Sequence, residues 1–543
     1  MGALFSWVHL RRMLGVGAAL GAVSIGVLVV WIIAVPYPVE QLSLEQAGST
    51  RVTDRYGQPL RDLLGPEGVR WSPVARDAIA DAMIEATLAG EDHRFWLHIG
   101  VDPWAILRAT QLNLREGRVY SGASTLTMQL VRLIEPASDR SLATKVREAI
   151  AALRLERAVD KDTILAQYLN RASYGPGIRG VEMASRLYFG ISAQRLSLAQ
   201  AAFLAALPRA PRRYDPYRHM ARALRRQRHI LRLMRDRAPE SERPRYETAL
   251  KVPLHLLPRQ RPFEAPHFVD HLVVDHPELF ADHPAVVRTS LDLELQHEVE
   301  VAVGRHVAAL GHHAPQAAVL VLDHASGEVL AWVGSRDWRD VDAQGRTRGV
   351  MARRAPGSTL KPFIYAMAFE QGWGPHTVLP DLPLQVKMPS GEVYIPRNYD
   401  GRYRGPVRVR DALAGSLNTP AVRTLQHVGV LPLVNRLKAA GMDSLESPGR
   451  YGPSLALGGA EVSLHDLTRG YASLARGGTA VELRVVPSPA QPQGERVMEE
   501  AVSYLVTDIL TDEMARQVAF GGAALRFSGA VALKTGTSDG SRD

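Results

Sequence analysis

An uncharged apolar run near the N-terminus places the strongest constraint on how this chain can fold. The stretch from Leu14 to Val35 carries no charge and meets the roughly 20 residues that a helix needs to cross a bilayer. Arg11 and Arg12 directly precede it, and positive charge on that flank favours a cytoplasmic N-terminus. We therefore expect residues 1–36 to form a short tail and a single-pass anchor. A cleaved signal peptide is the alternative, although no tidy small-x-small site precedes Pro36.

The size and charge of the chain narrow its class further. At 543 residues and roughly 150 residues per domain, several folded units are expected. A net charge of +9 favours anionic partners, which include nucleic acid, acidic lipid headgroups and pyrophosphate-bearing substrates. The absence of cysteine excludes disulfides, thiol catalysis and cysteine-ligated zinc. No histidine cluster has zinc spacing, and no dinucleotide or phosphate-loop motif is present.

The segment from about Thr50 to Arg237 has a helical pattern with one notable acid. Apolar residues recur at three- and four-residue spacing up to Gly90, which predicts a helix that ends there. Glu91 emerges at this helix end, followed by Phe95 and Trp96. Partial desolvation beside these rings would raise the pKa of the carboxyl toward the range of a general base. Taken alone, Glu91 is better explained as a solvated acid at a helix end.

Two further stretches carry polar groups at helical positions. Residues 122–130 place hydroxyls and free amides at a helix start, which suits phosphate binding, although a plain serine cap is the better explanation of this stretch taken alone. Residues 140–159 predict one long helix on which Glu148, Lys145 and Arg147 can converge on a pocket or form a surface ion pair. Its expected buried side comprises Val146, Ala149, Ile150 and Leu153.

Four ordered motifs in this region resemble the peptidoglycan glycosyltransferase domain of class A penicillin-binding proteins. They are Glu91-Asp92…Phe95…His98…Gly100, Gly122-x-Ser-Thr-Leu-Thr-x-Gln-Leu, Lys145…Arg147-Glu148 and Ile164-Leu165…Tyr168-Leu169-Asn170. The resemblance implies that residues 37–237 form a mostly helical, lysozyme-like domain that lies against the membrane and uses lipid II.

Carried over residue by residue, this resemblance assigns roles to the motif residues. Glu91 matches the base that deprotonates the 4-hydroxyl of the acceptor sugar for an inverting displacement, and Glu148 matches a second essential glutamate on the pyrophosphate side of the donor. Lys145 and Arg147 would help to neutralise the departing lipid pyrophosphate, since electrostatic stabilisation is usually the largest catalytic contribution. The expected substrate-binding residues are Asp92, Phe95, His98, Ser124, Thr125 and Gln129.

The basic segment that follows has several interpretations. Residues 209–237 are dense in arginine, and a solvated helix face explains them best. Contact with anionic headgroups is second, and nucleic acid is disfavoured because the segment lies beyond an anchor and lacks a recognisable binding fold. The proline-rich stretch after it leads us to interpret residues 238–290 as an interdomain linker.

The C-terminal part begins with a sheet signal and a nucleophile pattern. Residues 317–322 and 328–333 are apolar runs separated by a turn, which predicts a β-hairpin. Ser358 lies at a helix start with Lys361 one turn later, so the lysine amine can reach the serine hydroxyl. A lone Ser-x-x-Lys pattern is common by chance. Here it is followed by Ser416-Leu417-Asn418 and by Lys534-Thr535-Gly536-Thr537, in the order shared by serine β-lactamases and penicillin-binding proteins.

These motifs resemble the penicillin-binding transpeptidase domain, and residues 457–464 most resemble the penicillin-binding protein 1C subgroup. The resemblance makes Ser358 the acylated nucleophile and Lys361 its activating base, with Ser416 and Asn418 as a proton-relay and positioning pair. It also assigns the remaining motif residues: Lys534 and Thr535 would hold the peptide carboxylate, Gly536 would let substrate approach, and the N–H groups of Ser358 and Thr537 would form the oxyanion hole.

The C-terminus departs from this family pattern. The chain ends at Asp543, whereas the family continues through further strands and a terminal helix. We therefore expect residues 291–543 to form a truncated transpeptidase domain with an incomplete sheet. An open sheet edge would hold Lys534 weakly, so acylation by penicillin is expected to be weak or absent.

The sequence as a whole predicts a multidomain α+β protein: one transmembrane helix, a helical lysozyme-like domain and an α/β penicillin-binding domain. The leading hypothesis is an inner-membrane peptidoglycan synthase with periplasmic catalytic domains and both glycosyltransferase and D,D-transpeptidase activity. A hydrolase, such as a D,D-carboxypeptidase or β-lactamase, and a non-catalytic scaffold are the alternatives. Expected partners are lipid II, nascent glycan, stem peptides, β-lactam inhibitors, membrane lipids and other cell-wall synthesis proteins, but not nucleic acid. No cofactor is required, although the resemblance allows Mg²⁺ at the lipid pyrophosphate.

Overall fold

The computed structural model describes most of the chain after the predicted anchor. The described residues are 34–44, 48–65, 68–116, 124–136, 139, 141–259, 262–282, 284–311, 314–387, 393–490, 492–520 and 527–537. The predicted membrane span, residues 14–35, lies almost wholly outside them. Among the residues that are described, no helix combines the length and the apolar character needed to cross a bilayer.

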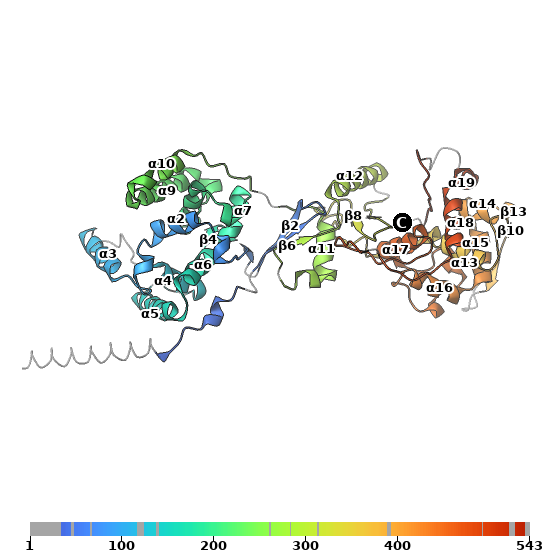
Figure 1. Cartoon of the computed structure of the whole chain (residues 1–543). Coiled ribbons are helices and arrows are strands. Elements are labelled where there is room, and N and C mark those ends of the chain that lie inside the picture. The colour runs from blue at the N-terminus through green and yellow to red at the C-terminus, as the bar shows by residue number, and fades with distance from the viewer. Residues whose placement is uncertain are drawn as a thin grey trace, which may run out of the picture. The chain divides into compact units, whose positions relative to one another are not determined.

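The chain divides into two compact units (Figure 1). The first comprises Met1–Arg51, Asp62–Pro262 and Phe280–Ala285, and the second comprises Val52–Arg61, Phe263–Leu279 and Val286–Asp543. The chain therefore contributes an early segment to the second unit before the first unit is complete. There, a three-stranded sheet has the order β2 (Pro59–Leu63), β1 (Thr50–Thr53) and β6 (Val286–Arg288).

The first unit is mostly helical, as the sequence predicts. Its helices are α2 (Asp81–Glu91), α3 (Pro103–Glu116), α4 (Leu126–Ile134), α5 (Leu142–Ala158), α6 (Lys161–Arg171), α7 (Val181–Phe189), α8 (Leu198–Ala206), α9 (Pro216–Arg237) and α10 (Arg243–Lys251). The short strands β3 (Arg70–Trp71), β4 (Ser173–Gly175) and β5 (Ile178–Arg179) form a second small sheet.

Helix α8 forms the centre of this unit. All its residues except Leu198 and Gln200 are buried, as expected of a helix surrounded by others. Five of its residues are alanine, and these small side chains let α2 and α9, its most extensive neighbours, pack closely. A capping box between Ser197 and Gln200 fixes where the helix begins. The helix thereby helps to hold α2, whose last residue is Glu91.

Helix α5 is buried on a different side from the one predicted. The buried residues are Thr144, Glu148, Ala152 and Leu155, whereas Val146 is 49% exposed. The prediction was wrong because it assigned the inward face by hydrophobicity. The inward face instead carries the Glu148 carboxylate, whose negative charge is paired with Arg132 of α4.

The stretch interpreted as a linker contains two packed helices. Helix α10 packs on α8 and α9 with Tyr246 and Ala249 buried. Helix α11 (Pro266–Asp275) belongs to the second unit. Both helices have proline within their first two positions, where its missing N–H costs nothing. Here, therefore, proline marks helix starts as well as loops.

The second unit combines the predicted hairpin with a helical core. Strands β7 (Val319–Leu322) and β8 (Val329–Val333) pair antiparallel, which confirms the hairpin, and α12 (Leu293–Leu310) packs on β8. The other helices are α13 (Lys361–Glu370), α14 (Val409–Ala414), α15 (Asn418–Val428), α16 (Val430–Ala439), α17 (Leu464–Ala475), α18 (Glu500–Thr511) and α19 (Glu513–Phe520). Helix α13 is buried at every residue except Glu370 and forms the middle of this core. Residues 527–537 contain no strand, so the Lys-Thr-Gly motif lies in an irregular segment.

Candidate active sites

Glu91 is the last residue of α2 and is held among polar neighbours from two other helices. Gln129 on α4 donates a hydrogen bond from Nε2 to Glu91 Oε2 at 3.3 Å. Arg226 on α9 brings Nη2 to 3.8 Å from Oε1. Oε1 is buried and accepts no hydrogen bond from the described residues. Burial raises the pKa of the Glu91 carboxyl, and Arg226 is the largest influence that opposes this rise.

The loop that follows Glu91 is fixed by its own acid and imidazole. The Gly100 N–H donates to His98 Nδ1 at 3.1 Å, so the proton of a neutral imidazole lies on Nε2. Nε2 then donates to Asp92 Oδ2 at 2.9 Å, and the same oxygen accepts the Leu126 N–H at 2.9 Å. Asp92 and His98 are both buried. They therefore join the loop to the start of α4, and their contacts are with protein groups.

Helix α4 begins at the phosphate-binding motif suggested by the sequence. Thr125, rather than Ser124, is its N-cap, and its hydroxyl accepts the Met128 N–H and donates to Gly100 O at 2.6 Å. Ser124 is half-buried just before it. Gln129, one helical turn after the cap, therefore lies against Glu91, while the cap attaches the same helix to the Glu91 loop.

Two buried side chains support these contacts. Tyr168 on α6 donates to Gln129 Oε1 at 3.4 Å, which leaves the Gln129 amide nitrogen to face Glu91. Phe95 is fully buried, and Lys161 Nζ lies 4.3 Å from the centre of its ring. Trp96, in contrast, is 51% exposed. Phe95 therefore acts as a packing residue of the loop rather than as an exposed binding surface.

Glu148 is paired with a residue that the sequence did not single out. Arg132 on α4 donates from Nε and Nη to the two carboxylate oxygens, both at 2.7 Å. This two-pronged geometry is the strong form of the ion pair. Lys145 and Arg147 are exposed, and none of the ion pairs among the described residues joins them to Glu148. In the described residues, Glu148 therefore pairs with Arg132 and not with these two cations; a shared pocket for Glu148, Lys145 and Arg147 stays a prediction.

Arg226 was also missed, since residues 209–237 were interpreted as a solvated face. The structure half-buries Arg226, and its guanidinium donates to Gly90 O at 3.1 Å. A signal was available in the sequence. Ala223 and Ile230, at three and four residues from Arg226, are apolar and buried, so helical spacing places Arg226 beside the inward face of α9.

The second site is centred on Lys361, the first residue of α13. Its side chain is fully buried. Nζ donates to Ser416 O at 2.7 Å, to Leu417 O at 3.1 Å and to Asn418 Oδ1 at 2.7 Å. Burial, assisted by the charge of Lys534, lowers the pKa of Lys361 far below its usual value. The amine is thus favoured in its neutral, proton-accepting form.

Ser416 lies between the two lysines of this site. Lys534 Nζ donates to Ser416 Oγ at 2.8 Å, and Lys361 Nζ lies 3.5 Å from the same oxygen. Burial lowers the pKa of Lys534 to about 7. Ser416 has φ of 56°, a left-handed conformation that is costly for a residue other than glycine and is often found at functional sites.

The Lys-Thr-Gly segment lies directly against the loop that carries Ser358. A Cβ atom on Gly357 would fall 2.7 Å from Thr537 N, and one on Gly536 would fall 2.7 Å from Pro356 O. Both positions therefore exclude a side chain. Thr535 contributes its carbonyl oxygen to Lys534 Nζ at 2.6 Å. The structure thus brings the Ser358, Ser416 and Lys534 motifs together, and it gives Lys534 two bonds where a weak attachment was expected.

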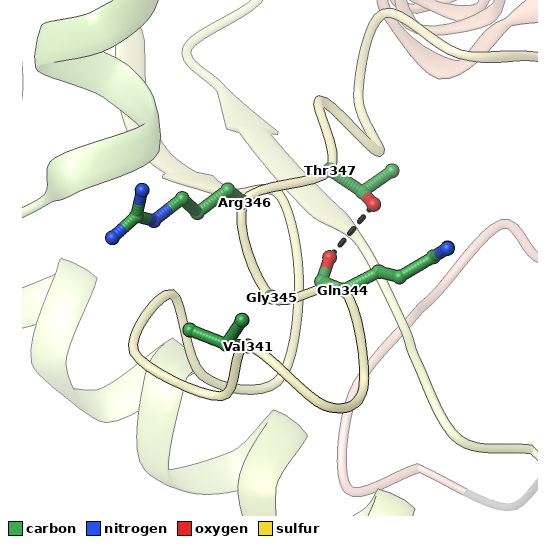
Figure 2. Close-up of a pocket in the computed structure, with 5 residues that line it drawn as sticks. All are labelled: Val341, Gln344, Gly345, Arg346 and Thr347. Atoms are coloured by element: carbon green, nitrogen blue, oxygen red, sulfur yellow. Dashed lines mark hydrogen bonds between the residues drawn. The ribbon is translucent and has the colours of Figure 1, made fainter.

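Other features of the described residues carry less chemistry. A surface hollow of about 300 Å³ is lined by Val341 and residues 344–347. Figure 2 shows these residues and the hydrogen bond that the Thr347 hydroxyl donates to Gln344 O. None of the predicted site residues lines it. No group of three or more histidine, aspartate or glutamate side chains in the described part of the chain is placed to hold a metal ion.

Known proteins share both parts of the chain that carry the sites around Glu91 and Lys361. Residues 57–235 match the transglycosylase family, and residues 317–541 match the penicillin-binding protein transpeptidase domain. Penicillin-binding protein 1A of Aquifex aeolicus is 31% identical to this chain over 87% of the chain and 77% of that protein. The chain therefore belongs to the class A penicillin-binding proteins, which carry both domains.

Two further relatives define the extent of the match. Penicillin-binding protein 1C of Escherichia coli K12 is 35% identical over 507 residues, which cover 92% of this chain and 63% of that protein. The chain thus spans less than two thirds of the length of this relative. The crystal structure of penicillin-binding protein 1A from Haemophilus influenzae superposes with a TM-score of 0.53 at 18% identity, over 89% of this chain and 81% of that one. This last similarity establishes the shared fold.

Proposed function

We propose that this protein is a peptidoglycan synthase that polymerises lipid II and cross-links stem peptides, working from the outer face of the cytoplasmic membrane. The observation that carries the proposal is the buried Glu91 carboxyl. Its pKa is raised, and its Oε1 accepts no hydrogen bond from the described residues. A buried oxygen atom that receives no hydrogen bond costs free energy. The 4-hydroxyl of the acceptor sugar would donate the missing hydrogen bond to Oε1.

The glycosyl transfer then needs one displacement. Glu91 takes the proton of the acceptor 4-hydroxyl while that oxygen attacks the anomeric carbon of the donor. The bond from this carbon to the lipid pyrophosphate breaks as the new one forms, which inverts the configuration. Arg132, whose side chain is 44% exposed, and the exposed Lys145 and Arg147 supply positive charge for the leaving pyrophosphate.

The peptide transfer uses the second site, which is centred on Lys361. Neutral Lys361 takes the proton of Ser358 Oγ as this oxygen attacks the carbonyl of the penultimate D-alanine. The N–H groups of Ser358 and Thr537 receive the developing oxyanion. Ser416 Oγ, placed between Lys361 and Lys534, passes a proton to the departing D-alanine amine, and a second stem peptide then accepts the acyl group.

Membrane attachment is supported by exposed apolar residues in the first unit. They are Trp96, Leu97, Ile99, Trp104, Ile106 and Leu107, which are 44–76% exposed. Exposed apolar side chains this close together in the sequence are typical of binding surfaces. Contact with lipid would place Glu91, which begins this stretch, within reach of a lipid-linked substrate. The predicted anchor and the periplasmic location fit this arrangement.

A polymerisation assay with a matched control tests the first activity. The Glu91→Gln variant keeps the size of the side chain but removes the base, so lipid II polymerisation should fall about 10²- to 10⁴-fold. Glu85→Gln, on the exposed side of the same helix and paired with Arg245 at 3.0 Å, should stay active. Products shorter than the donor would indicate a hydrolase. Activity of Glu91→Gln close to wild type would refute the role of Glu91.

Labelling with a fluorescent penicillin tests the second activity. Wild-type protein should form a covalent adduct that survives denaturation, and Ser358→Ala should not. A folded wild-type protein that forms neither glycan polymer nor adduct would support the scaffold alternative.

A further inference from the structure

A chain of buried hydrogen bonds leads away from Lys361 to two residues that none of the motifs includes. Asn418 Oδ1 accepts from Lys361 Nζ at 2.7 Å. The Asn418 N–H donates to Asn398 Oδ1 at 2.8 Å. Asn398 Nδ2 in turn lies 2.9 Å from each oxygen of Asp381. Asp381 is fully buried and Asn398 is 5% exposed, so water cannot substitute freely for these contacts.

The direction of every bond in this chain follows from Asp381. An ionised carboxylate only accepts hydrogen bonds, and Asp381 is surrounded by donors: Asn398 Nδ2, the Thr419 hydroxyl and the Arg404 N–H at 2.9 Å. Asn398 must therefore turn Nδ2 toward Asp381, which leaves Oδ1 to face Asn418. A reversed Asn398 amide would place its N–H groups against the Asn418 N–H.

The segment that contains Asn398 also fixes the side chain of Asn418. Asn418 Nδ2 donates to Arg397 O at 2.7 Å, so its Oδ1 is the atom left for Lys361. Of the three close acceptors around Lys361 Nζ, the other two are backbone carbonyls of Ser416 and Leu417. Asn418 Oδ1 is thus a closer side-chain acceptor than Ser416 Oγ, which lies 3.5 Å from Nζ, and its position depends on residues 397 and 398.

We propose that Asp381 and Asn398 are positioning residues for acylation, which hold Asn418 so that the Lys361 amine is aimed at Ser358. A neutral amine has two N–H donors and one lone pair. These two donors bind two of the three close acceptors, so the positions of the acceptors decide where the lone pair points. The proposal requires that it point to the Ser358 hydroxyl. The inference rests on the proposed transpeptidase function. A shift of about 1 Å in a reacting group can cost about 10²-fold in rate, so remote anchors of this kind affect chemistry without touching substrate.

The test is a donor–acceptor exchange, read out by the kinetics of penicillin acylation. Asp381→Asn introduces an amide where every neighbour is a donor, and Asn398→Asp sets two carboxylates against each other. Each single variant should lower the acylation rate constant about 10- to 100-fold with little change in the pre-acylation dissociation constant. The double variant restores one donor between the two positions and should recover much of this loss. Recovery is partial because Asn398 Nδ2 also donates to Arg402 O at 2.8 Å.

A control in the same loop separates positioning from a loss of charge. Asp400→Asn removes an exposed carboxylate that pairs with Arg404 at 2.8 Å and has no bond to Asn418; its acylation should match wild type. Single variants acylated within about twofold of wild type, or a double variant no faster than the slower single one, would overturn the proposal. The proposal would also be overturned if the variants lower only the fraction of protein that is folded, while the folded protein is acylated at the wild-type rate. That result would indicate a purely structural role.

A structural measurement keeps the two proposals distinguishable. If wild-type protein is not acylated, the transpeptidase function fails, while the geometry can still be examined by crystallography of the Asn398→Ala variant. The proposal expects Asn418 Oδ1 to move out of hydrogen-bond distance of Lys361 Nζ. Retention of that contact would overturn the positioning role whatever the activity.

Discussion

Replacement of Arg226 by methionine should move the pH dependence of glycan polymerisation. Arg226 is the largest of the influences that lower the pKa of Glu91 and so oppose the rise caused by burial. Methionine is of similar length and uncharged, so Arg226→Met should raise this pKa further. The base form of Glu91 exists only above its pKa. The acidic limb of the pH–rate profile should therefore move to higher pH.

The size of the shift can be bounded from the distance. Two unit charges at about 4 Å interact by about 4 kcal/mol at an effective dielectric constant of 20 and by about 1 kcal/mol in water. The relevant atoms are 3.8 Å apart, and the two side chains are 12% and 11% exposed, so the true value lies between these limits. At about 1.4 kcal/mol per pKa unit, the acidic limb should rise by about one to three pH units.

The assay is the pH dependence of kcat/KM for lipid II polymerisation, which reports groups of the free enzyme. Arg225→Met is the matched control, because Arg225 is the exposed neighbour on the same helix; its profile should match wild type. A uniform loss of rate at every pH, with no movement of the acidic limb, would refute the electrostatic role of Arg226 and indicate contact with substrate instead.

The same linkage predicts a change in stability. A raised pKa means that native Glu91 binds its proton more tightly than the unfolded chain does. The free energy of unfolding therefore falls as pH rises from the ordinary glutamate pKa through the raised one. Arg226→Met should extend this fall to higher pH in denaturant titrations, and a dependence identical to wild type would contradict the assignment.

Three further predictions concern other contacts. Lys534 must be protonated to bind a carboxylate, so the second-order rate constant of penicillin acylation should decline as pH rises through about 7. The lowered pKa of Lys534 also predicts that the free energy of unfolding increases from about pH 7 upward. An acylation rate and a free energy of unfolding that do not change with pH in this range would contradict both predictions. Arg132→Met leaves the buried Glu148 carboxylate unpaired and should destabilise the protein by about 2 kcal/mol in urea, whereas an unchanged midpoint would show that solvent replaces the arginine. Gly536→Ala places a methyl group 2.7 Å from Pro356 O and should slow acylation with a destabilisation of about 1–3 kcal/mol; acylation at the wild-type rate would show that this segment shifts easily.

Motif order in the sequence was sufficient to predict both domains, because each motif is a local pattern. The apolar spacing before Gly90 predicts the end of α2, and the Ser-x-x-Lys spacing follows from one helical turn. Thr125 and Gln129 were named as site residues since the motif itself contains them. Their partners were different. Arg132 reaches Glu148 from another helix, and sequence spacing carries no information about such a contact.

The sequence by itself determined the two classes of chemistry, the helical character of the first unit and the hairpin of the second. The tertiary structure decided which charges meet. It selected Arg226 from an arginine-rich helix and turned α5 so that Glu148 faces inward. It also placed Asp381 and Asn398 behind the Lys361 amine. The physical reason is that a pKa and a hydrogen-bond direction depend on burial and on distances of a few ångströms between helices, and only packing fixes these.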